Sequence, residues 1–319
     1  MKFEFTIIES IYVHLFTNME SIFKQYGWNV IDYTSIVQGL INRTYTVQTD
    51  AGNYILQTIN HHIFKDPWAI DHNINSIGDY LSNYAPSYLF THLVRAKHGK
   101  TLIEWEGKFY RAFQKIDAYA LSVLENADQA KEAATQFGYF TKILSDFDID
   151  SLKITLPDFH NLSLRYHQFS EALVKGNSNR IQDNQDAIRF LREHYWIVKQ
   201  FEQFIQHKDV QKRVTHHDTK ISNVLFKRMN GHEKAVCVID LDTVMPGYFI
   251  SDIGDMCRTC LCNVSEEEAD LNLVQVDASK WEAIQNGYLT HTQGMLSQYE
   301  LDHLFFGGHC VRNKPIIQF

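Results

Sequence analysis

Residues 214–240 read VTHHDTKISNVLFKRMNGHEKAVCVID, and they are the most informative stretch of the chain. Within them, two short apolar runs, Val224–Phe226 and Ala235–Ile239, flank a polar loop that contains Asn230-Gly231. Asn-Gly between apolar runs is typical of a β-hairpin, because both residues tolerate the positive φ angles of a tight turn. The sequence therefore predicts two antiparallel strands joined by a turn at this dipeptide.

Two oxygen-bearing side chains lie at the open end of this predicted hairpin. A turn near Gly231 places Asn223 within about two residues, or roughly 7 Å, of the position opposite Asp240. An amide oxygen and a carboxylate that are distant along the chain would then meet. Mg²⁺ prefers such oxygen ligands and keeps its other positions for phosphate and water, so this end of the hairpin is a candidate Mg²⁺ site.

The loop before the hairpin has a recognisable spacing. His216, Asp218 and Asn223 fit the pattern H-x-D-x-x-x-x-N of a kinase catalytic loop, in which the Asp accepts the proton of the acceptor hydroxyl and the Asn binds Mg²⁺. The pattern alone is weak, because His, Asp and Asn also cap turns and helices for local reasons. The alternative interpretation makes Asp218 an ordinary turn carboxylate and Asp240 a strand-end residue.

Two stretches, His216–Asn223 and Val238–Gly247, resemble a known family. They are similar to the aminoglycoside phosphotransferase/choline kinase-like superfamily, in particular its N-acetylhexosamine 1-kinase-like branch. The longer stretch is characteristic of that branch, and a weaker match follows at Asp252–Asp255. The resemblance implies ATP and Mg²⁺ as cofactors, Asp218 as the catalytic base, and loop-bracing roles for His216, Asp252 and Asp255. The implied metal ligands are Asn223, Asp240 and, as a further ligand, Asp242.

The N-terminal third has the pattern of a small antiparallel sheet. Residues 35–49 are predicted to form a strand, a turn with Gly39 and a second strand, and a third strand begins at Tyr54 after the turn Asp50–Asn53. A glycine in the first turn lets backbone N–H groups approach phosphates. The evidence from this pattern alone is poor, because the chain has no G-x-G-x-x-G or Walker A sequence and most such hairpins are only structural.

The resemblance implies that this sheet is a nucleotide lid. The branch has Gly-x-Ile-Asn-x-Thr-Tyr where this chain has Gly39–Tyr45. Two departures are visible. Leu40–Arg43 stands where the branch often has His-Ile-Asn-Asp, which affects any sugar contact made there. Gln57 and Thr58 stand where many relatives have a basic residue, and a protein kinase uses a Lys at this place to pair the nucleotide phosphates. Mg²⁺ and backbone donors would then carry more of the charge stabilisation.

Further nucleotide contacts are expected where the lid ends. Phe113–Asp117 is the predicted crossover to a second lobe, and its backbone groups would meet adenine in a kinase-like cleft. Lys65 and Arg43 are basic residues near Gln57 in the sequence. The predicted cofactor-binding residues are Gly39, Asn42, Thr44, Gln57, Gln114 and Ile116.

Strands come first in this chain and helices afterwards, which favours an α+β architecture over alternating βα units. The resemblance implies a protein-kinase-like two-lobed fold, with an antiparallel-sheet N-lobe (1–116) as the nucleotide lid and a mainly helical C-lobe (117–319) with the catalytic loop and the metal-binding hairpin. The other predicted elements are a helix over Trp68–Leu81, strands around Leu89–Lys97 and Lys108–Ile116, helices over Ala130–Leu144 and Asp186–Ile205, and a loop over Asp146–His160.

The composition argues against several classes of protein, among them nucleic-acid-binding, membrane-spanning and disulfide-rich proteins. The chain is 45% hydrophobic and 21% charged with a net charge of −8, which argues against nonspecific nucleic-acid binding. We expect no membrane span, no signal peptide and a cytoplasmic location, because no apolar run spans a bilayer and Glu4 interrupts the N-terminus. Five cysteines do not suggest a disulfide framework, and a zinc site at Cys257, Cys260 and Cys262 lacks a second CxxC pair.

These observations favour a kinase that transfers the γ-phosphate of ATP to a hydroxyl of a small molecule, in particular the anomeric hydroxyl of an N-acetylhexosamine, so that the expected partner is an amino sugar. One alternative is a kinase of choline, homoserine or an aminoglycoside. Another is a catalytically impaired nucleotide-binding protein, because 309–319 no longer resembles the branch, whose members continue with helices that help to close the sugar site. We therefore expect a truncated C-terminus.

Overall fold

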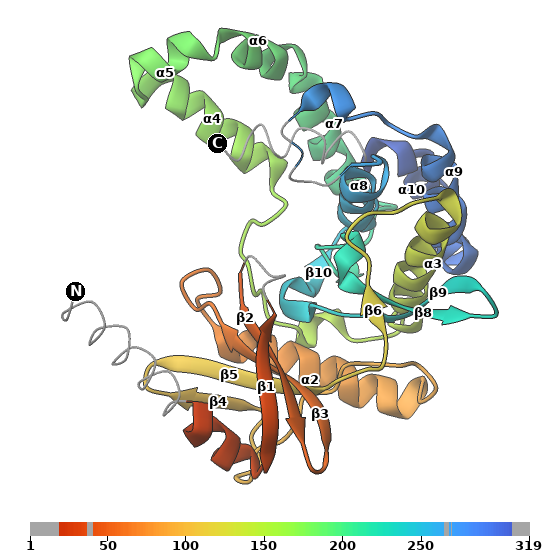
Figure 1. Cartoon of the computed structure of the whole chain (residues 1–319). Helices are drawn as coiled ribbons and strands as arrows, with labels where there is room; N and C mark the ends of the chain where they lie inside the picture. The colour runs from red at the N-terminus through yellow and green to blue at the C-terminus, as the bar shows by residue number, and fades with distance from the viewer. Residues whose placement is uncertain (1–18, 37–40, 265–267, 269, 308–319) are drawn as a thin grey trace. The chain divides into compact units, whose positions relative to one another are not determined.

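A computed structural model describes residues 19–36, 41–264, 268 and 270–307. Gly39 and the atypical stretch 309–319 therefore lie outside the described residues. The chain separates into two compact units (Figure 1). The first contains Met1–Asp79 and Thr91–Asp117, and the second contains Tyr80–Phe90 and Ala118–Phe319.

The first unit is built on a five-stranded antiparallel sheet with the strand order β1-β2-β3-β5-β4. The turn Glu106-Gly107 joins β4 to β5, and both of its residues have positive φ, as tight hairpins require. The predicted antiparallel sheet is thus confirmed. Its strands are β1 (Val30–Ile36), β2 (Arg43–Thr49), β3 (Gly52–Ile59), β4 (Leu102–Trp105) and β5 (Lys108–Gln114).

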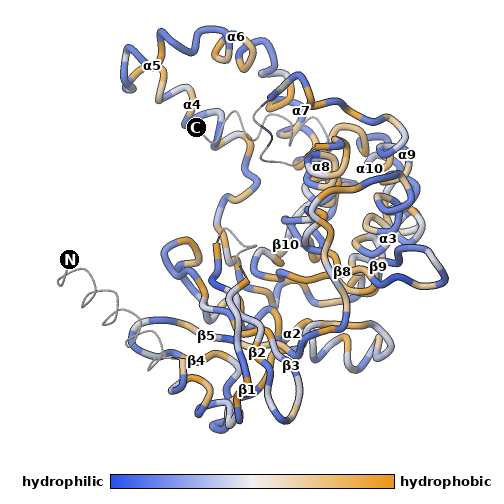
Figure 2. The backbone as a smooth tube through the Cα atoms, viewed as in Figure 1, coloured by the Kyte–Doolittle hydropathy of each residue, from blue (hydrophilic) through white to orange (hydrophobic). Residues whose placement is uncertain are grey.

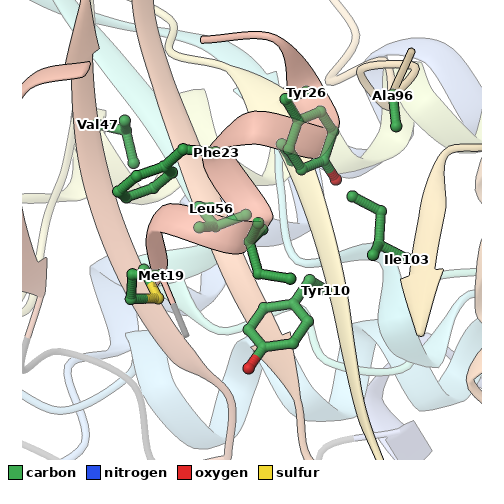
Figure 3. Packing of buried hydrophobic residues seen from close by; sticks show 10 residues of the cluster. Met19, Phe23, Tyr26, Val47, Leu56, Ala96, Ile103 and Tyr110 are labelled. Carbon is green, nitrogen blue, oxygen red and sulfur yellow. The ribbon is translucent and has the colours of Figure 1, made fainter. Parts of the chain in front are cut away.

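One face of this sheet carries the hydrophobic core of the unit. A helix over residues 19–26 packs there, and its apolar side chains form one buried cluster with Leu56 and Tyr110 (Figure 3). Successive residues of a strand point to opposite faces, so the neighbours of these residues, Gln57 and Arg111, point away from the cluster.

Helix α2 (Pro67–Tyr84) lies against the other face. Trp68 makes an edge-on ring contact with Phe109 at 6.4 Å between centroids, and Asp71 accepts a hydrogen bond of 2.6 Å from the Thr101 hydroxyl beside β4. The predicted helix behind the sheet is therefore confirmed. Its apolar residues at helical spacing are all buried: Ile70, Ile74, Ile77 and Leu81.

The strand predicted around Leu89–Lys97 is wrong. This segment is extended but makes only an isolated bridge, between Leu93 and Phe113. Its backbone N–H groups donate to unrelated partners, Val94 to the carbonyl of Ala112 and Ala96 to that of Lys100, so no continuous ladder forms. The edge of the sheet is instead the short strand β4, which lies after the predicted segment.

The second unit is mainly helical. Helices α3 and α9 pack so closely that a Cβ atom added at Gly287 would lie 2.5 Å from the carbonyl oxygen of Lys131, which explains a glycine in mid-helix. The helices are α3 (Ala127–Ile143), α4 (Leu162–Lys175), α5 (Ser178–Asp183), α6 (Gln185–Glu193), α7 (Tyr195–Gln206), α8 (Phe249–Cys260), α9 (Ala278–Thr292) and α10 (Gln298–Asp302).

The helix predicted over Ala130–Leu144 is confirmed by α3, but that over Asp186–Ile205 is two helices, α6 and α7. His194 separates them, and its ring nitrogen Nδ1 contacts the carbonyl oxygen of Phe190 at 2.7 Å. This side chain competes with the backbone N–H groups for a helical carbonyl oxygen, which favours the end of α6 at this point. The apolar residues nevertheless keep their helical spacing from α6 into α7. The predicted loop over Asp146–His160 contains a single 3₁₀ turn, Ile149–Ser151.

The predicted hairpin is confirmed as β8 (Val224–Met229) and β9 (His232–Val238), with β6 (Tyr119–Ala120) beside β8. Asn230 and Gly231 both have positive φ, which gives the tight turn. Figure 2 shows this turn as a hydrophilic tip. Of the helices within the described ranges, none has the length and apolar character needed to cross a membrane.

Candidate active site

The loop His216–Asn223 lies between short elements of the second unit. It leaves β7 (Arg213–Thr215), which pairs antiparallel with β10 (Met245–Gly247), and it ends in a 3₁₀ turn over Ile221–Asn223 that runs directly into β8. The loop is therefore held between two separate strand pairings.

The backbones of Asn223 and Asp240 lie near each other at the open end of the hairpin. Val224 faces Val238 in the register of β8 and β9, and the next rung is a hydrogen bond of 2.9 Å from the Ile239 N–H to the Asn223 carbonyl oxygen. Asp240 thus lies one residue beyond the position opposite Asn223. Its backbone has φ of 61°, a left-handed conformation two residues after the end of β9.

Two residues of the same loop, Lys220 and Asn223, donate hydrogen bonds to Asp218. The Lys220 ammonium donates to Asp218 Oδ2 at 2.8 Å, and the Asn223 amide Nδ2 donates to the same oxygen at 3.0 Å and to the Asp218 carbonyl oxygen at 2.8 Å. Burial raises the pKa of the Asp218 carboxyl, but Lys220, His216 and Asn223 together lower it below its ordinary value. The carboxyl is therefore ionised at neutral pH.

The residues at the hairpin end have the donor set that Mg²⁺ requires. Because the Asn223 Nδ2 group donates to Asp218, its other amide atom, the oxygen Oδ1, is the one that a cation can use. Asp240 is half-buried, and Asp242 is 2% exposed in the 3₁₀ turn Leu241–Thr243. Mg²⁺ in phosphate-transferring sites needs only one or two carboxylates besides phosphate oxygens, so these residues fit the ion.

His216 braces the loop as a neutral ring. Its Nε2 contacts the carbonyl oxygen of Ile239 at 3.0 Å and its Nδ1 accepts from the Asp218 N–H at 3.3 Å, so Nε2 carries the proton. Burial lowers the pKa of His216 to about 4, although Asp218 opposes this effect. Thr243 also donates its hydroxyl to the His216 carbonyl oxygen at 2.7 Å. The ring thus connects the loop to the end of the hairpin.

Asp252, on α8, fixes the backbone of the same loop. Its two carboxyl oxygens accept the N–H groups of His216 at 3.1 Å and His217 at 2.7 Å, and its carbonyl oxygen accepts from the Thr219 hydroxyl at 2.7 Å. Burial raises the pKa of the Asp252 carboxyl to about 7, while the two backbone donors oppose that rise. Asp255 pairs with Arg258 at 2.9 Å instead. The expected bracing role is borne out for Asp252.

Gly247 is required by the close approach of His217. A Cβ atom added at Gly247 would lie 2.3 Å from His217 Cε1 and 2.4 Å from Nε2. His217 has φ of 68°, and its carbonyl oxygen contacts His160 Nε2 at 3.0 Å. The glycine therefore permits the position of the ring next to Asp218 in the chain.

The cysteines of α8 are core residues. Cys257 and Cys260 are buried, and burial raises the pKa of the Cys260 thiol to about 12 and also raises the pKa of Cys257, so both thiols stay protonated. The residues that the structure describes contain no group of three or more His, Cys, Asp or Glu side chains arranged to hold a metal ion.

Of the residues predicted to bind the nucleotide, those that the structure describes lie on or beside the sheet of the first unit. Thr44 faces Gln57 in the pairing of β2 with β3, and the Gln57 amide donates to the Thr44 hydroxyl at 3.2 Å. Asn42 caps the sheet locally, because its Oδ1 accepts the Asn60 N–H at 2.9 Å. Gln114 is the exposed last residue of β5, and Ile116 is half-buried two residues beyond it.

Comparison with known proteins decides the family. Residues 32–285 match the phosphotransferase enzyme family (APH), which is most of the chain. The chain belongs to this family. The prediction of an ATP-dependent phosphotransferase with an alcohol-group acceptor is thereby confirmed, and the family consists of small-molecule kinases of the kind expected.

Solved structures of other phosphotransferases share the fold. The microcompartment-associated aminopropanol kinase has a TM-score of 0.64 at 16% identity, covering 94% of this chain and 88% of its own. The GDP and kanamycin complex of APH(2")-IIia has a TM-score of 0.59 at 14% identity, with coverages of 94% and 89%. An ethanolamine kinase from Plasmodium vivax has a TM-score of 0.53 at 15% identity, with coverages of 90% and 74%.

These likenesses confirm the predicted protein-kinase-like fold, with an antiparallel-sheet N-terminal lobe and a helical C-lobe. The superfamily predicted from the sequence is confirmed as well, at the level of the phosphotransferase family.

Lys220 is a polar residue of this phosphotransferase that sequence reasoning missed. It lies two residues after Asp218 inside the recognised motif, and its ammonium reaches the Asp218 carboxyl. Burial lowers the pKa of Lys220, but the opposing effect of Asp218 prevails and the pKa lies above its ordinary value. Both members of the pair are therefore charged. The sequence shows that Lys220 is close to Asp218 in the motif, but their contact depends on the conformation of the loop.

Proposed function

We propose that this phosphotransferase is a Mg²⁺-dependent kinase that transfers the γ-phosphoryl group of ATP to a hydroxyl of a small molecule. The observation that supports the proposal most is the convergence of Asp218, Asn223 and Asp240 at one end of the β8–β9 hairpin. A proton acceptor and two oxygen ligands are what this reaction requires of the protein, because its catalysis is mostly positioning and charge stabilisation.

Asp218 orients the acceptor hydroxyl and receives its proton. The bond between the γ-phosphorus and the bridging oxygen of ADP breaks, a bond from phosphorus to the acceptor oxygen forms, and the hydroxyl proton goes to Asp218. A carboxylate with a lowered pKa is a weak base, so it accepts the proton late, as a loose phosphoryl-transfer transition state permits. Until then its main contribution is orientation of the hydroxyl.

The Asn223 and Asp240 side chains would hold the metal ion, with Asp242 as a further ligand. When bound, Mg²⁺ neutralises charge on the phosphate oxygens. The left-handed backbone at Asp240 turns the chain immediately after the strand. The amide of Asn223, whose nitrogen is committed to Asp218, presents its oxygen in one fixed orientation.

Lys220→Met should move the acidic limb of the pH–rate profile to higher pH. The ammonium that lowers the pKa of Asp218 would be gone while burial continued to raise it, so a higher pH would be needed to ionise the carboxyl. The measurement is kcat against pH for the variant, the wild type and the control Lys175→Met, which removes an exposed lysine of α4. An acidic limb that does not move would contradict the assigned coupling.

For the acceptor, the proposal is the anomeric hydroxyl of an N-acetylhexosamine. Its support is the stretch Val238–Gly247, which resembles the N-acetylhexosamine 1-kinase-like branch. A second candidate is an amino alcohol, because an aminopropanol kinase and an ethanolamine kinase are among the proteins of similar fold. The proposed location is the cytoplasm, where ATP and small acceptors are available.

An acceptor panel tests the proposal. ATP consumption would be measured with N-acetylhexosamines, neutral hexoses, amino alcohols, choline, homoserine and aminoglycosides, followed by identification of the phosphorylated product. Acceptor-dependent ADP formation with an N-acetylhexosamine, giving a 1-phosphate, is the expected result. A preference for amines would replace the sugar with the second candidate. Mg·ATP binding without turnover of any acceptor would indicate an impaired enzyme and overturn the proposed activity.

A further inference from the structure

We propose that Arg111 contacts the nucleotide phosphates and takes the place of the basic residue that β3 lacks. The inference rests on the proposed function, because it concerns how ATP is held. β3 carries Gln57 where a protein kinase has its phosphate-pairing Lys. Arg111 lies on the neighbouring strand β5, directly opposite Gln57 in the strand register.

The contacts between these residues form one row across three strands. Arg111 donates from Nε at 3.0 Å and from Nη2 at 2.8 Å to the single amide oxygen of Gln57. Gln57 in turn donates from its amide nitrogen to the Thr44 hydroxyl at 3.2 Å. Thr44, Gln57 and Arg111 are directly paired residues of β2, β3 and β5, so they lie on the same face of the sheet.

Two residues that were predicted to bind the nucleotide lie on this face of the sheet. Thr44 and Gln57 are two of the predicted cofactor-binding residues, and their hydrogen bonds lead to Arg111. The opposite face is filled by the buried cluster around Leu56 and Tyr110 (Figure 3). Arg43, by contrast, pairs with Thr58 and therefore lies on the other face from Gln57. Arg43 does not occupy the place of the missing cation.

The chemistry of the contact suits phosphate binding. Gln57 orients the guanidinium through two hydrogen bonds to its amide oxygen. A guanidinium is always protonated and binds phosphate oxygens through a planar pair of donors. The group also lies over the Phe113 ring, with 5.2 Å from Cζ to the ring centroid, which limits its motion further. Arg111 is 1% exposed, so water screens its charge only weakly.

Helix α2 carries a carboxyl group beside the sheet, and in a kinase lid the helix next to the sheet likewise carries an acidic residue. Asp71 lies on α2 and accepts hydrogen bonds from Thr101 at 2.6 Å and from the Asn75 amide at 3.2 Å. Burial raises the pKa of Asp71, and Thr101 and the charge of Arg111 oppose that rise. The field of Arg111 therefore reaches the helix beside the sheet.

The competing explanation is that Arg111 only supports the sheet, and nucleotide binding separates the two. Arg111→Gln should weaken Mg·ATP binding by roughly ten- to a hundredfold, the loss expected for charged hydrogen bonds to phosphate, while adenosine binding stays unchanged. Arg111→Lys should retain part of the ATP affinity. Both are measured by calorimetry, with Arg95→Gln as the matched control, because Arg95 is an exposed arginine of the same unit.

A swapped pair tests the same point if the single variant is unstable. Gln57→Arg combined with Arg111→Gln keeps both groups on the same face and moves the cation to β3. The double variant should recover most of the ATP affinity. Equal losses of ATP and adenosine binding in a folded Arg111→Gln protein would overturn the inference, as would unchanged ATP binding in that variant, or a folded swapped pair that binds adenosine but not ATP.

The proposed function fails differently. A wild-type protein that binds no Mg·ATP would overturn the kinase activity and this inference together. Normal ATP binding by both the wild type and Arg111→Gln would overturn only the role of Arg111.

Discussion

Asp218→Asn should lower the turnover number by about a hundredfold or more, the usual loss when a positioned proton acceptor is removed. The amide has nearly the shape of the carboxylate but cannot accept the hydroxyl proton. Mg·ATP binding should change little, because the proposed ligands Asn223 and Asp240 remain. The measurement is ADP formation with the acceptor found in the panel, combined with calorimetric binding of Mg·ATP.

The control for this experiment is Asp183→Asn, which makes the same carboxylate-to-amide replacement at an exposed aspartate at the end of α5. It should keep full activity and show that purification and handling of a variant cause no loss. A thermal melt of Asp218→Asn establishes that the protein is folded. Turnover near that of the wild type would remove Asp218 from the mechanism, whatever the acceptor.

Glu300→Gln should reduce the free energy of unfolding by roughly 3 kcal/mol or more, as is typical when one partner of a buried ion pair is removed. Glu300 on α10 binds Arg213 on β7 through two parallel hydrogen bonds, Nη1 to Oε1 at 2.6 Å and Nη2 to Oε2 at 2.9 Å. The Glu300 side chain is fully buried and that of Arg213 is 10% exposed. The variant leaves a buried guanidinium opposite a neutral amide. Urea unfolding followed by circular dichroism measures the loss.

Two control variants show whether burial causes this loss. Asp186→Asn breaks the ion pair with Arg189 on α6, whose side chains are 92% and 67% exposed, and it should change stability by less than about 0.5 kcal/mol. Replacing both buried partners, Arg213→Met with Glu300→Leu, should recover much of the stability, because no unpaired charge is left. A loss under about 0.5 kcal/mol for Glu300→Gln would show that the pair does not hold α10 to β7.

The Arg213–Glu300 pair also lies next to the candidate active site in the chain. Arg213 begins β7, the strand that leads directly into His216 and the loop of Asp218. Glu300 additionally caps α10, where its side chain accepts the Ser297 N–H and the Ser297 hydroxyl accepts the Glu300 N–H. Loss of this carboxylate is therefore expected to loosen both the start of α10 and the entry of the loop.

Features that depend on neighbouring residues were predictable from the sequence. The β8–β9 hairpin follows from Asn230-Gly231 between apolar runs, and α2 follows from four apolar residues at helical spacing. The approach of the Asn223 and Asp240 backbones follows from the hairpin, because a tight turn sets the register of both strands. The catalytic-loop motif is likewise local, whereas the protein-kinase-like fold was implied by the resemblance of His216–Asn223 and Val238–Gly247 to a known family.

Features that leave no mark on the apolar pattern, or that depend on distant residues, were not predictable. The helix break at His194 does not interrupt the apolar period, so the pattern of Asp186–Ile205 contained no sign of it. The segment Leu89–Lys97 has a strand-like composition, but its partners are set by the tertiary fold. The contact of Arg111 with Gln57 joins residues 54 positions apart and requires knowing that β5, and not β4, pairs with β3.

The placement of Arg111 opposite Gln57 bears on how catalytic competence is judged across related genomes. A criterion that looks only for a lysine on β3 would class this chain as inactive, because β3 carries Gln57 and no lysine. The binding of a triphosphate depends on the position of positive charge in space. Adjacent antiparallel strands bring residues that are far apart in the sequence, such as Gln57 and Arg111, next to each other. Pseudoenzyme assignments in this fold are therefore better made on pairs of facing positions than on one position.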